Sequence, residues 1–309
     1  MKILLAKPRG FCAGVDRAIH IVEKALEKFG RPIYVRHEIV HNKTVVDRLR
    51  QMGAVFVEDL AEVPEGAVVV FSAHGVAENV YAQAAQRKQH VLDASCPLVK
   101  KVHLAAKRQH DAGAHVVLIG HAGHAEVEGT LGQLPPGAIS LVGSVDDLEQ
   151  LNVPEQASLA FITQTTLSVD ETRDVIAALK RRFPGIKGPD RGDLCYATTN
   201  RQAAVRAICN QIDILLVVGA SNSSNSNRLR ELGSASGVPS YLIADAQDIH
   251  MEWFHHVERV GLTSGASAPE EVVKRVVAWI QSAYPGSSVE THVGMEEHIR
   301  FSLPTELVD

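Results

Sequence analysis

Residues 2–30, KILLAKPRGFCAGVDRAIHIVEKALEKFG, are the stretch of sequence that decides the fold. The apolar run at 3–6 is typical of a buried strand, and Cys12 follows it closely. Beyond the cysteine, apolar residues recur at helical spacing until Gly30 supplies a stop. The stretch therefore predicts a strand over 2–6, a loop that carries a cysteine, and a helix.

The same pattern of a cysteine followed by apolar runs and polar positions at matched distances recurs at Cys96 and Cys195. We call this pattern the frame. An apolar run ends 24 residues after each of the three cysteines, and a polar position follows 28 or 29 residues after each, at His41, His124 and Ser223. A third polar position follows one more apolar run, at His74, Thr165 and Ser267. Successive cysteines are 84 (96−12) and 99 (195−96) residues apart. Because internal repetition dictates architecture, we expect three similar lobes.

Each lobe is expected to be of the α/β class. Runs of Val, Ile and Leu without polar alternation, at 116–119 and 214–218, are typical of parallel strands buried on both faces. Their alternation with helices predicts small, mostly parallel sheets. The expected ranges are 12–95 for lobe 1, 96–194 for lobe 2, 195–285 for lobe 3, completed by an N-terminal strand in 1–11, and 286–309 for a C-terminal tail that is a lid, a packing strand or a frayed end.

Ligands of open α/β sheets collect at the carboxyl ends of the strands. We therefore expect the three lobes to be arranged pseudo-threefold around one centre, with a thiolate from each. The residues before Cys195, GPDRGDL at 188–194, are a poor strand by composition, so the approach to this cysteine is expected to differ.

The composition is that of a cytoplasmic protein. The 309 residues are 45% hydrophobic and 22% charged, with a net charge of −5. No apolar run is long enough for a bilayer or a signal peptide, and no basic stretch suits nucleic acid. Four cysteines do not make a disulfide framework in a chain of this size. We expect free thiols and neither a membrane nor a nucleic-acid partner.

Three thiolates from separate lobes suit a metal centre. Soft sulfur ligands favour zinc, Cu(I) or an iron–sulfur cluster. A structural zinc site normally has four ligands with close CxxC pairs, and the chain contains no CxxC. An iron–sulfur cubane with one open iron fits better, because that iron can act as a Lewis acid while the cluster supplies electrons. Cys209 lies on an apolar helical stripe and is expected in the core.

The other positions of the frame carry short hydrogen-bond donors or potential cations, which suit an oxygen-rich anion such as a diphosphate. These residues are His41, His74, His124, Thr165, Thr166, Ser223, Ser224, Asn225 and Ser267. The chain has neither GxxxxGK[ST] nor a GxGxxG that opens a helix, so nucleotide binding by those routes is not expected.

Glu126 is the carboxylate placed in the loop GHAGHAEVEG at 120–129. Neighbouring negative charge from a cluster and a diphosphate would raise the pKa of this carboxyl group, which makes it a candidate proton donor. A solvated surface position fits the sequence equally well, and a metal site with His121 and His124 is a weaker alternative.

Motifs along nearly the whole chain closely resemble the 4-hydroxy-3-methylbut-2-enyl diphosphate reductases, the LytB family. They are RGFCAGV at 9–15, EIVHN at 38–42, SAHGV at 72–76, DASCPLV at 93–99, GHAGHAEVEGT at 120–130, TQTTLSVD at 163–170, CYATTNRQ at 195–202, SNSSNSNRL at 221–229 and SGASAP at 264–269. The resemblance implies reductive dehydroxylation of (E)-4-hydroxy-3-methylbut-2-enyl diphosphate to isopentenyl and dimethylallyl diphosphates, the last step of the methylerythritol phosphate route.

When the family's site residues are placed on the matching positions of this chain, the resemblance implies one [4Fe-4S] cluster with three ligands, Cys12, Cys96 and Cys195. It also implies an open iron for the substrate hydroxyl. It implies substrate binding by His41, His74, His124, Thr165, Ser223, Ser224, Asn225 and Ser267. It places Glu126, Thr165 and His124 in catalysis. Electrons are expected from a small protein such as a ferredoxin or flavodoxin.

Two other functions remain open at the level of sequence. An iron–sulfur hydratase would use the open iron without net electron transfer, and dependence on a reductant separates it from a reductase. A cluster-binding sensor protein would have no need for so many diphosphate-type donors.

Overall fold

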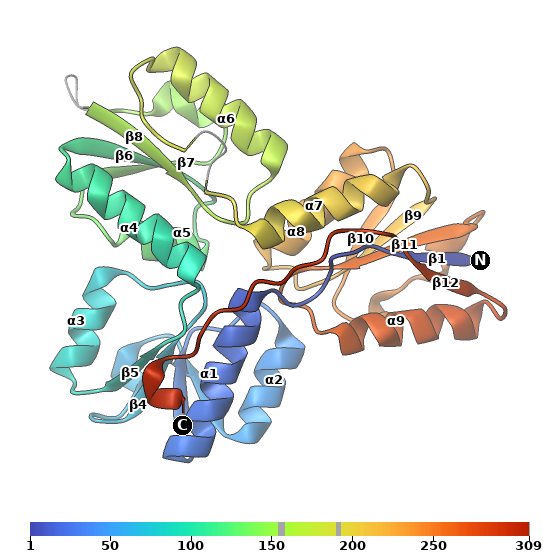
Figure 1. Ribbon diagram of the computed structural model, residues 1–309, viewed down its shortest axis with the longest axis horizontal. Coiled ribbons are helices and arrows are strands. Elements are labelled where there is room, and N and C mark those ends of the chain that lie inside the picture. The colour runs from blue at the N-terminus through green and yellow to red at the C-terminus, as the bar shows by residue number, and fades with distance from the viewer. Residues whose placement is uncertain (154–157, 190–192, 309) are drawn as a thin grey trace. The chain divides into compact units, whose positions relative to one another are not determined.

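The computed structural model describes residues 1–153, 158–189 and 193–308 (Figure 1). Strands alternate with helices, and every strand pair within its sheets is parallel, which confirms the predicted α/β class. None of the helices in this part of the chain is long and apolar enough to cross a membrane.

The strands are β1 (Lys2–Leu5), β2 (Ile33–Arg36), β3 (Ala54–Val57), β4 (Val68–Phe71), β5 (His90–Asp93), β6 (Ala114–Ile119), β7 (Ile139–Val142), β8 (Ser158–Thr163), β9 (Ile214–Val218), β10 (Ser240–Ile243), β11 (Arg259–Ser264) and β12 (Ser288–Thr291). The α-helices are α1 (Ala13–Phe29), α2 (Lys43–Met52), α3 (Glu78–Gln86), α4 (Pro97–Asp111), α5 (Ala125–Leu131), α6 (Val169–Arg182), α7 (Tyr196–Cys209), α8 (Ser224–Ala235) and α9 (Glu270–Ala283).

The repeated frame of the sequence corresponds to repeated local structure. A helix begins directly after each cysteine of the frame: α1 after Cys12, α4 after Cys96 and α7 after Cys195. Helix α1 ends where the sequence predicts, because Gly30 adopts a left-handed conformation with φ of 78° that side chains avoid. The frame therefore places each cysteine in a loop at the start of a helix.

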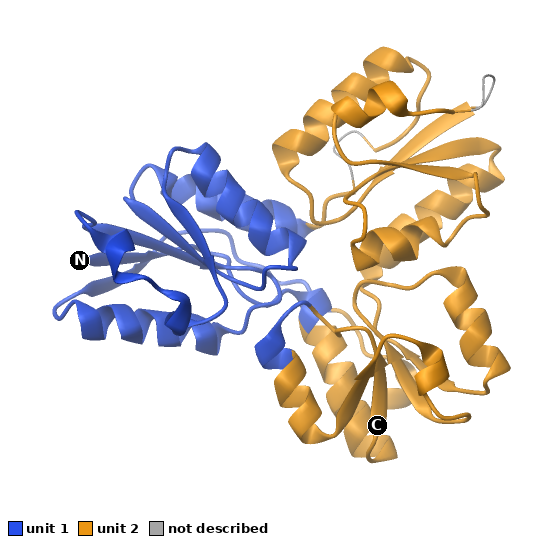
Figure 2. Ribbon diagram, turned by 180° about the vertical axis from the view of Figure 1, so that it is seen from behind, with its two compact units in different colours: residues 1–15, 41–45, 196–300 blue, residues 16–40, 46–195, 301–309 orange. Residues whose placement is uncertain are grey.

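The chain forms two compact units (Figure 2). Unit 1 consists of residues 1–15, 41–45 and 196–300, and unit 2 of residues 16–40, 46–195 and 301–309. Unit 1 contains a five-stranded sheet of order β10-β9-β11-β1-β12. Unit 2 contains a four-stranded sheet, β3-β2-β4-β5, and a three-stranded sheet, β7-β6-β8. Strand β1 thus lies in the sheet of β9, β10 and β11, and the predicted lobe boundaries stay a proposal.

The sheet of unit 1 is buried on both faces, as its apolar runs predict. Alternate residues of a strand point to opposite faces, so Ile3, Leu216 and Val218 pack with Val276 of α9. On the other face, Leu4, Leu215 and Val217 pack with Val205 and Ile208 of α7 and with Leu229 of α8. Helices on both faces leave the carboxyl edge of the strands free for functional loops.

The two sheets of unit 2 are joined by hydrogen bonds. The amide nitrogen of Glu78, at the start of α3, donates to the carbonyl of Gly132 at 2.9 Å. The side chain of Gln133, 8% exposed, donates from Nε2 to the carbonyl of Val76 at 2.7 Å. These buried contacts fix the loop after β4 against helix α5.

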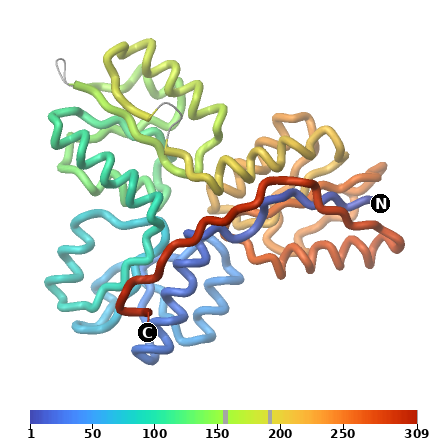
Figure 3. The backbone as a smooth tube through the Cα atoms, in the orientation of Figure 1, coloured from blue at the N-terminus to red at the C-terminus, as the bar shows by residue number. Residues whose placement is uncertain are grey.

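The predicted tail supplies structure to both units. Residues Ser288–Thr291 form β12 beside β1, so this part is a packing strand. Residues 301–308 run along α1 (Figure 3), where Arg17 Nε donates to the Ser302 carbonyl at 2.8 Å and Lys28 Nζ donates to the Glu306 carbonyl at 2.6 Å. Asp309 lies outside the described residues.

Candidate active site

In unit 2, Cys96 is tied to the loop that carries His74. The amide of Cys96 donates to the carbonyl of Ala73 at 2.9 Å, and Ala73 directly precedes His74. The imidazole rings of His74 and His124 then meet edge to face, with centroids 6.0 Å apart and planes at 85°. The loops after β4, β5 and β6 are thereby brought together.

His124 is held by the start of helix α5. Its Nδ1 atom accepts a hydrogen bond from the amide of Glu126 at 3.1 Å, so His124 is the N-cap of α5. This acceptor role assigns the proton of the neutral ring to Nε2. The Nε2–H group is then a donor suited to an anionic oxygen.

Glu126 is buried, with 3% of its surface exposed, and both carboxyl oxygens contact Thr165. Oε1 accepts from the amide of Thr165 at 2.7 Å, and Oε2 accepts from its hydroxyl at 3.0 Å. Burial raises the pKa of Glu126 to about 7, and the two hydrogen bonds from Thr165 oppose the rise. Loss of water is therefore by itself sufficient for the predicted direction of the shift.

Thr165 also holds the third cysteine. Its carbonyl accepts from the amide of Cys195 at 3.0 Å. No strand leads to Cys195 within the described residues; Lys187 makes an isolated bridge with Ala160, and the predicted poor strand at 188–194 is partly outside the described residues. Within unit 2, neighbouring contacts therefore connect Cys96, His74, His124, Glu126, Thr165 and Cys195.

Unit 1 repeats this arrangement with different side chains. The amide of Cys12 donates to the carbonyl of Ala266 at 3.3 Å, and the next residue, Ser267, donates from Oγ to the carbonyl of His41 at 3.0 Å. Asn222 Nδ2 lies 3.3 Å from His41 Nδ1. Asn222 is two residues before the start of α8 at Ser224. The loops after β1, β9 and β11 thus come together with residues 41–45.

The start of α8 presents polar groups. Ser223 is its N-cap and accepts from the amide of Ser226 at 3.3 Å, while Ser224 is the first helical residue. Asn225 is 5% exposed, and neither atom of its side-chain amide has a hydrogen-bond partner within the part of the chain that the structure describes. A helix N-terminus attracts anions, and a buried amide without a partner is costly unless a ligand satisfies it.

The thiols of the frame differ from the fourth cysteine. Within the described residues none of the four cysteines forms a disulfide; Cys12, Cys96 and Cys195 are partly exposed, whereas Cys209 is buried at 8% exposure. Cys209 packs in the apolar core beneath α7, as predicted.

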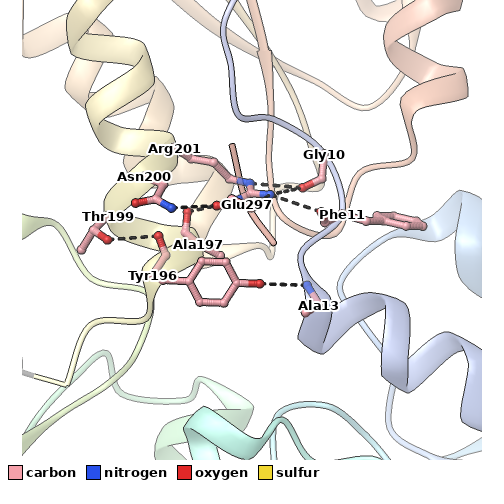
Figure 4. A network of polar contacts seen from close by, with 9 residues as sticks. All are labelled: Gly10, Phe11, Ala13, Tyr196, Ala197, Thr199, Asn200, Arg201 and Glu297. Carbon is pink, nitrogen blue, oxygen red and sulfur yellow. Dashed lines mark hydrogen bonds and ion pairs between the residues drawn. The ribbon is translucent and has the colours of Figure 1, made fainter. Parts of the chain in front are cut away.

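Arg201 is a residue that the sequence analysis did not single out. Its side chain is fully buried and donates to the carbonyl of Gly10 from Nη2 at 2.7 Å and to Glu297 Oε1 from Nη1 at 3.0 Å (Figure 4). Tyr196, on the same helix, accepts from the amide of Ala13 through its hydroxyl at 3.0 Å. Helix α7 therefore fixes the backbone on both sides of Cys12.

The charge of Arg201 also acts on Cys12. Removal from water raises the pKa of the Cys12 thiol, and Arg201 opposes this shift. Because metals bind the thiolate, Arg201 favours the ligating form.

Replacing Arg201 by methionine should lower the free energy of unfolding of metal-free protein by about 3–5 kcal/mol, because the largely buried Glu297 would lose its cation and the carbonyls of Gly10 and Phe11 would lose their buried donor. Urea denaturation measures this loss. Arg206→Met, exposed on the same helix, is the matched control, with an expected change within about 0.5 kcal/mol. Equal losses in the two variants would contradict the role given to the Arg201–Glu297 pair.

Comparison with known proteins identifies the family. The family model described as "LytB protein" matches residues 3–281. A Burkholderia pseudomallei 4-hydroxy-3-methylbut-2-enyl diphosphate reductase is 58% identical over 307 residues, 99% of this chain and 97% of the relative. A solved Plasmodium falciparum E-1-hydroxy-2-methyl-but-2-enyl-4-diphosphate reductase is 38% identical with a TM-score of 0.96, covering 99% of this chain and 96% of that one.

A second solved structure is of an (E)-4-hydroxy-3-methyl-but-2-enyl diphosphate reductase described as the terminal enzyme of the non-mevalonate pathway. It is 31% identical with a TM-score of 0.65, over 91% of this chain and all of that one. The resemblance found in the motifs is thus confirmed over the full length, and the chain belongs to the LytB family.

Proposed function

We infer that this chain is an oxidoreductase that converts (E)-4-hydroxy-3-methylbut-2-enyl diphosphate to isopentenyl and dimethylallyl diphosphates, the terminal step of the non-mevalonate pathway. Removing the hydroxyl group as water consumes two electrons and two protons. The observation that carries the proposal is the series of contacts in unit 2 that joins the backbone of Cys96 and Cys195 to a carboxyl group with a pKa of about 7. A reductive dehydroxylase needs both a metal centre and a proton donor.

We propose that Cys12, Cys96 and Cys195 hold one [4Fe-4S] cluster, with one iron left for the substrate hydroxyl. The fit rests on three partly exposed cysteines outside any disulfide, each at the start of a helix and each with its backbone amide held by a hydrogen bond. When bound, such a cluster would supply electrons and a Lewis acid. The reductases' need for electrons is consistent with this donor set.

The diphosphate is assigned to the polar residues of both units. Asn225 would satisfy its buried amide by binding a phosphate oxygen, and Ser223, Ser224, Ser267 and His41 line the same loops. His74 and His124 offer imidazole donors from unit 2. This assignment extends the sequence prediction and gives each side chain a donor role toward an anion.

Glu126 is proposed to donate the proton that the leaving hydroxyl requires. With a pKa of about 7, its carboxyl group is partly protonated at neutral pH, where an ordinary glutamate is ionised. Thr165 contacts Glu126 through its hydroxyl, which can pass the proton on. His124, bonded to the amide of Glu126, orients the start of the same helix.

A reductant separates this function from that of a hydratase. Cluster-loaded protein under argon should consume the substrate only when dithionite and methyl viologen are present, and both diphosphate products should appear in the chromatogram. Consumption without reductant would favour a hydratase. If protein with an intact cluster showed no reaction at all, the result would favour a cluster-binding sensor protein.

The raised pKa of Glu126 should appear in stability as a function of pH. Native protein retains a proton that the unfolded chain releases above pH 4.5, so the stability due to Glu126 falls as the pH rises to about 7. The advantage of Glu126→Gln over the parent protein should therefore grow by about 3 kcal/mol across this window. Urea denaturation of both proteins at several pH values measures it.

The same Glu126→Gln protein should bind iron normally but lose turnover by about 10²–10⁴-fold, the usual contribution of general acid catalysis. Full activity with an intact cluster would exclude Glu126 as the proton donor. A pH-independent stability difference would instead show that its carboxyl group has an ordinary pKa.

A further inference from the structure

Unit 2 contains a cleft of about 770 Å³ that is lined by helix α4, by strand β8 and by residues 187–189. Its lining includes Pro97, Lys100, Lys101, Leu104, Arg108 and Lys187. The site described above uses none of these residues. The cleft lies within one unit, so it is complete without any residue of unit 1.

The cleft is positively charged although the chain as a whole carries a net charge of −5. Among its described lining residues, Lys100, Lys101, Arg108 and Lys187 are basic and Asp193 is the one acid. Lys100 is paired with Asp93 at 2.7 Å. Lys101, Arg108 and Lys187 are exposed, and within the described ranges they form no ion pair of 4.0 Å or shorter. Asp193 interacts electrostatically with both Lys101 and Arg108. Because the basic residues outnumber this acid, the cleft keeps an excess of positive charge for a negatively charged partner.

An apolar side chain lies between these cations. Leu104 is 66% exposed and lies in the lining of the cleft. Positions 101, 104 and 108 are three and four residues apart, so they share one face of α4. An apolar centre with a charged rim is the usual anatomy of a protein–protein interface.

The cleft adjoins two of the proposed cluster ligands. Pro97 directly follows Cys96, and Asp193 precedes Cys195 by two residues. Lys100 and Lys101 are four and five residues beyond Cys96, which corresponds to about 6–8 Å along a helix. A molecule seated on this face of α4 would lie beside the segments that hold Cys96 and Cys195.

We propose that this face of α4, with Lys100, Lys101, Leu104, Arg108 and Lys187, is the docking surface for a small acidic electron-donor protein. The inference rests on the proposed function, because each turnover takes two electrons from an external reductant. The donor is oxidised twice by one electron, and the C–O bond to the substrate's hydroxyl group breaks with uptake of two protons to give an isoprenyl diphosphate and water. Nothing in the chain's sequence offers a nicotinamide loop.

The size of the basic face favours a small protein over a nucleic acid. A polyanion follows a long basic track and would meet the negative charge of the rest of this chain. A small acidic protein covers the cations and Leu104 without extending beyond them. Charge pairs of this kind act mainly on association rate and are weakened by salt.

The test compares a protein donor with a chemical donor. Lys101→Glu/Arg108→Glu should raise the KM for reduced flavodoxin by about tenfold or more at low salt, while turnover with dithionite and methyl viologen stays within about twofold of the parent protein. Leu104→Ala should raise the same KM without any change of charge. Lys274→Glu/Arg181→Glu, with the same change of net charge at exposed positions elsewhere, should behave like the parent protein.

The affinity for oxidised flavodoxin, measured by calorimetry, tests the docking surface without depending on catalysis. Binding by the parent protein that is lost in Lys101→Glu/Arg108→Glu supports the docking surface even if no substrate is turned over, in which case the proposed function alone fails. Equal binding and equal KM in both proteins would overturn the proposal, as would an equal loss in the control variant. Binding of a 20-nucleotide single strand that depends on the same residues would instead identify a nucleic-acid surface.

Discussion

The site depends on one backbone interaction that occurs three times. The amide of each frame cysteine donates to a carbonyl in the loop after another strand: Cys12 to Ala266, Cys96 to Ala73 and Cys195 to Thr165. Each carbonyl belongs to, or directly precedes, a polar residue of the frame, namely Ser267, His74 or Thr165. A buried backbone amide must be paired, so these bonds set where each thiol lies relative to its neighbouring polar group, whatever side chains the loops carry.

The charged groups that are buried near these loops either position the backbone or offer a proton. Arg201, which is fully buried, and Glu297, which is partly exposed, form an ion pair that holds the loop before Cys12, and such pairs position groups more than they add stability. Glu126 has no cation beside it among the described residues, and its carboxyl group therefore favours the protonated form. The exposed cations Lys101 and Arg108 of α4 lie outside this interior and contribute to the excess positive charge of the cleft.

Much of this was predictable because it is local. Apolar runs and a glycine stop specify β9 and the end of α1, and the repeated frame marks the loops that carry Cys12, Glu126 and Ser267. Arg201 escaped prediction because its partner, Glu297, lies 96 residues away in a tail without periodic pattern. Residues 41–45 belong to a different unit from the chain on either side of them, which no composition shift indicates. The three lobe ranges and the cytoplasmic location stay predictions.

The central claim is that three thiols hold one cluster, and iron analysis of cysteine variants tests it most directly. Protein purified without oxygen should contain roughly four irons and as much acid-labile sulfide per chain. Serine at Cys12, Cys96 or Cys195 should each remove most of both, whereas Cys209→Ser, in the apolar core, should keep them. Stoichiometric zinc in place of iron, or undiminished iron after any of the three substitutions, would contradict the account.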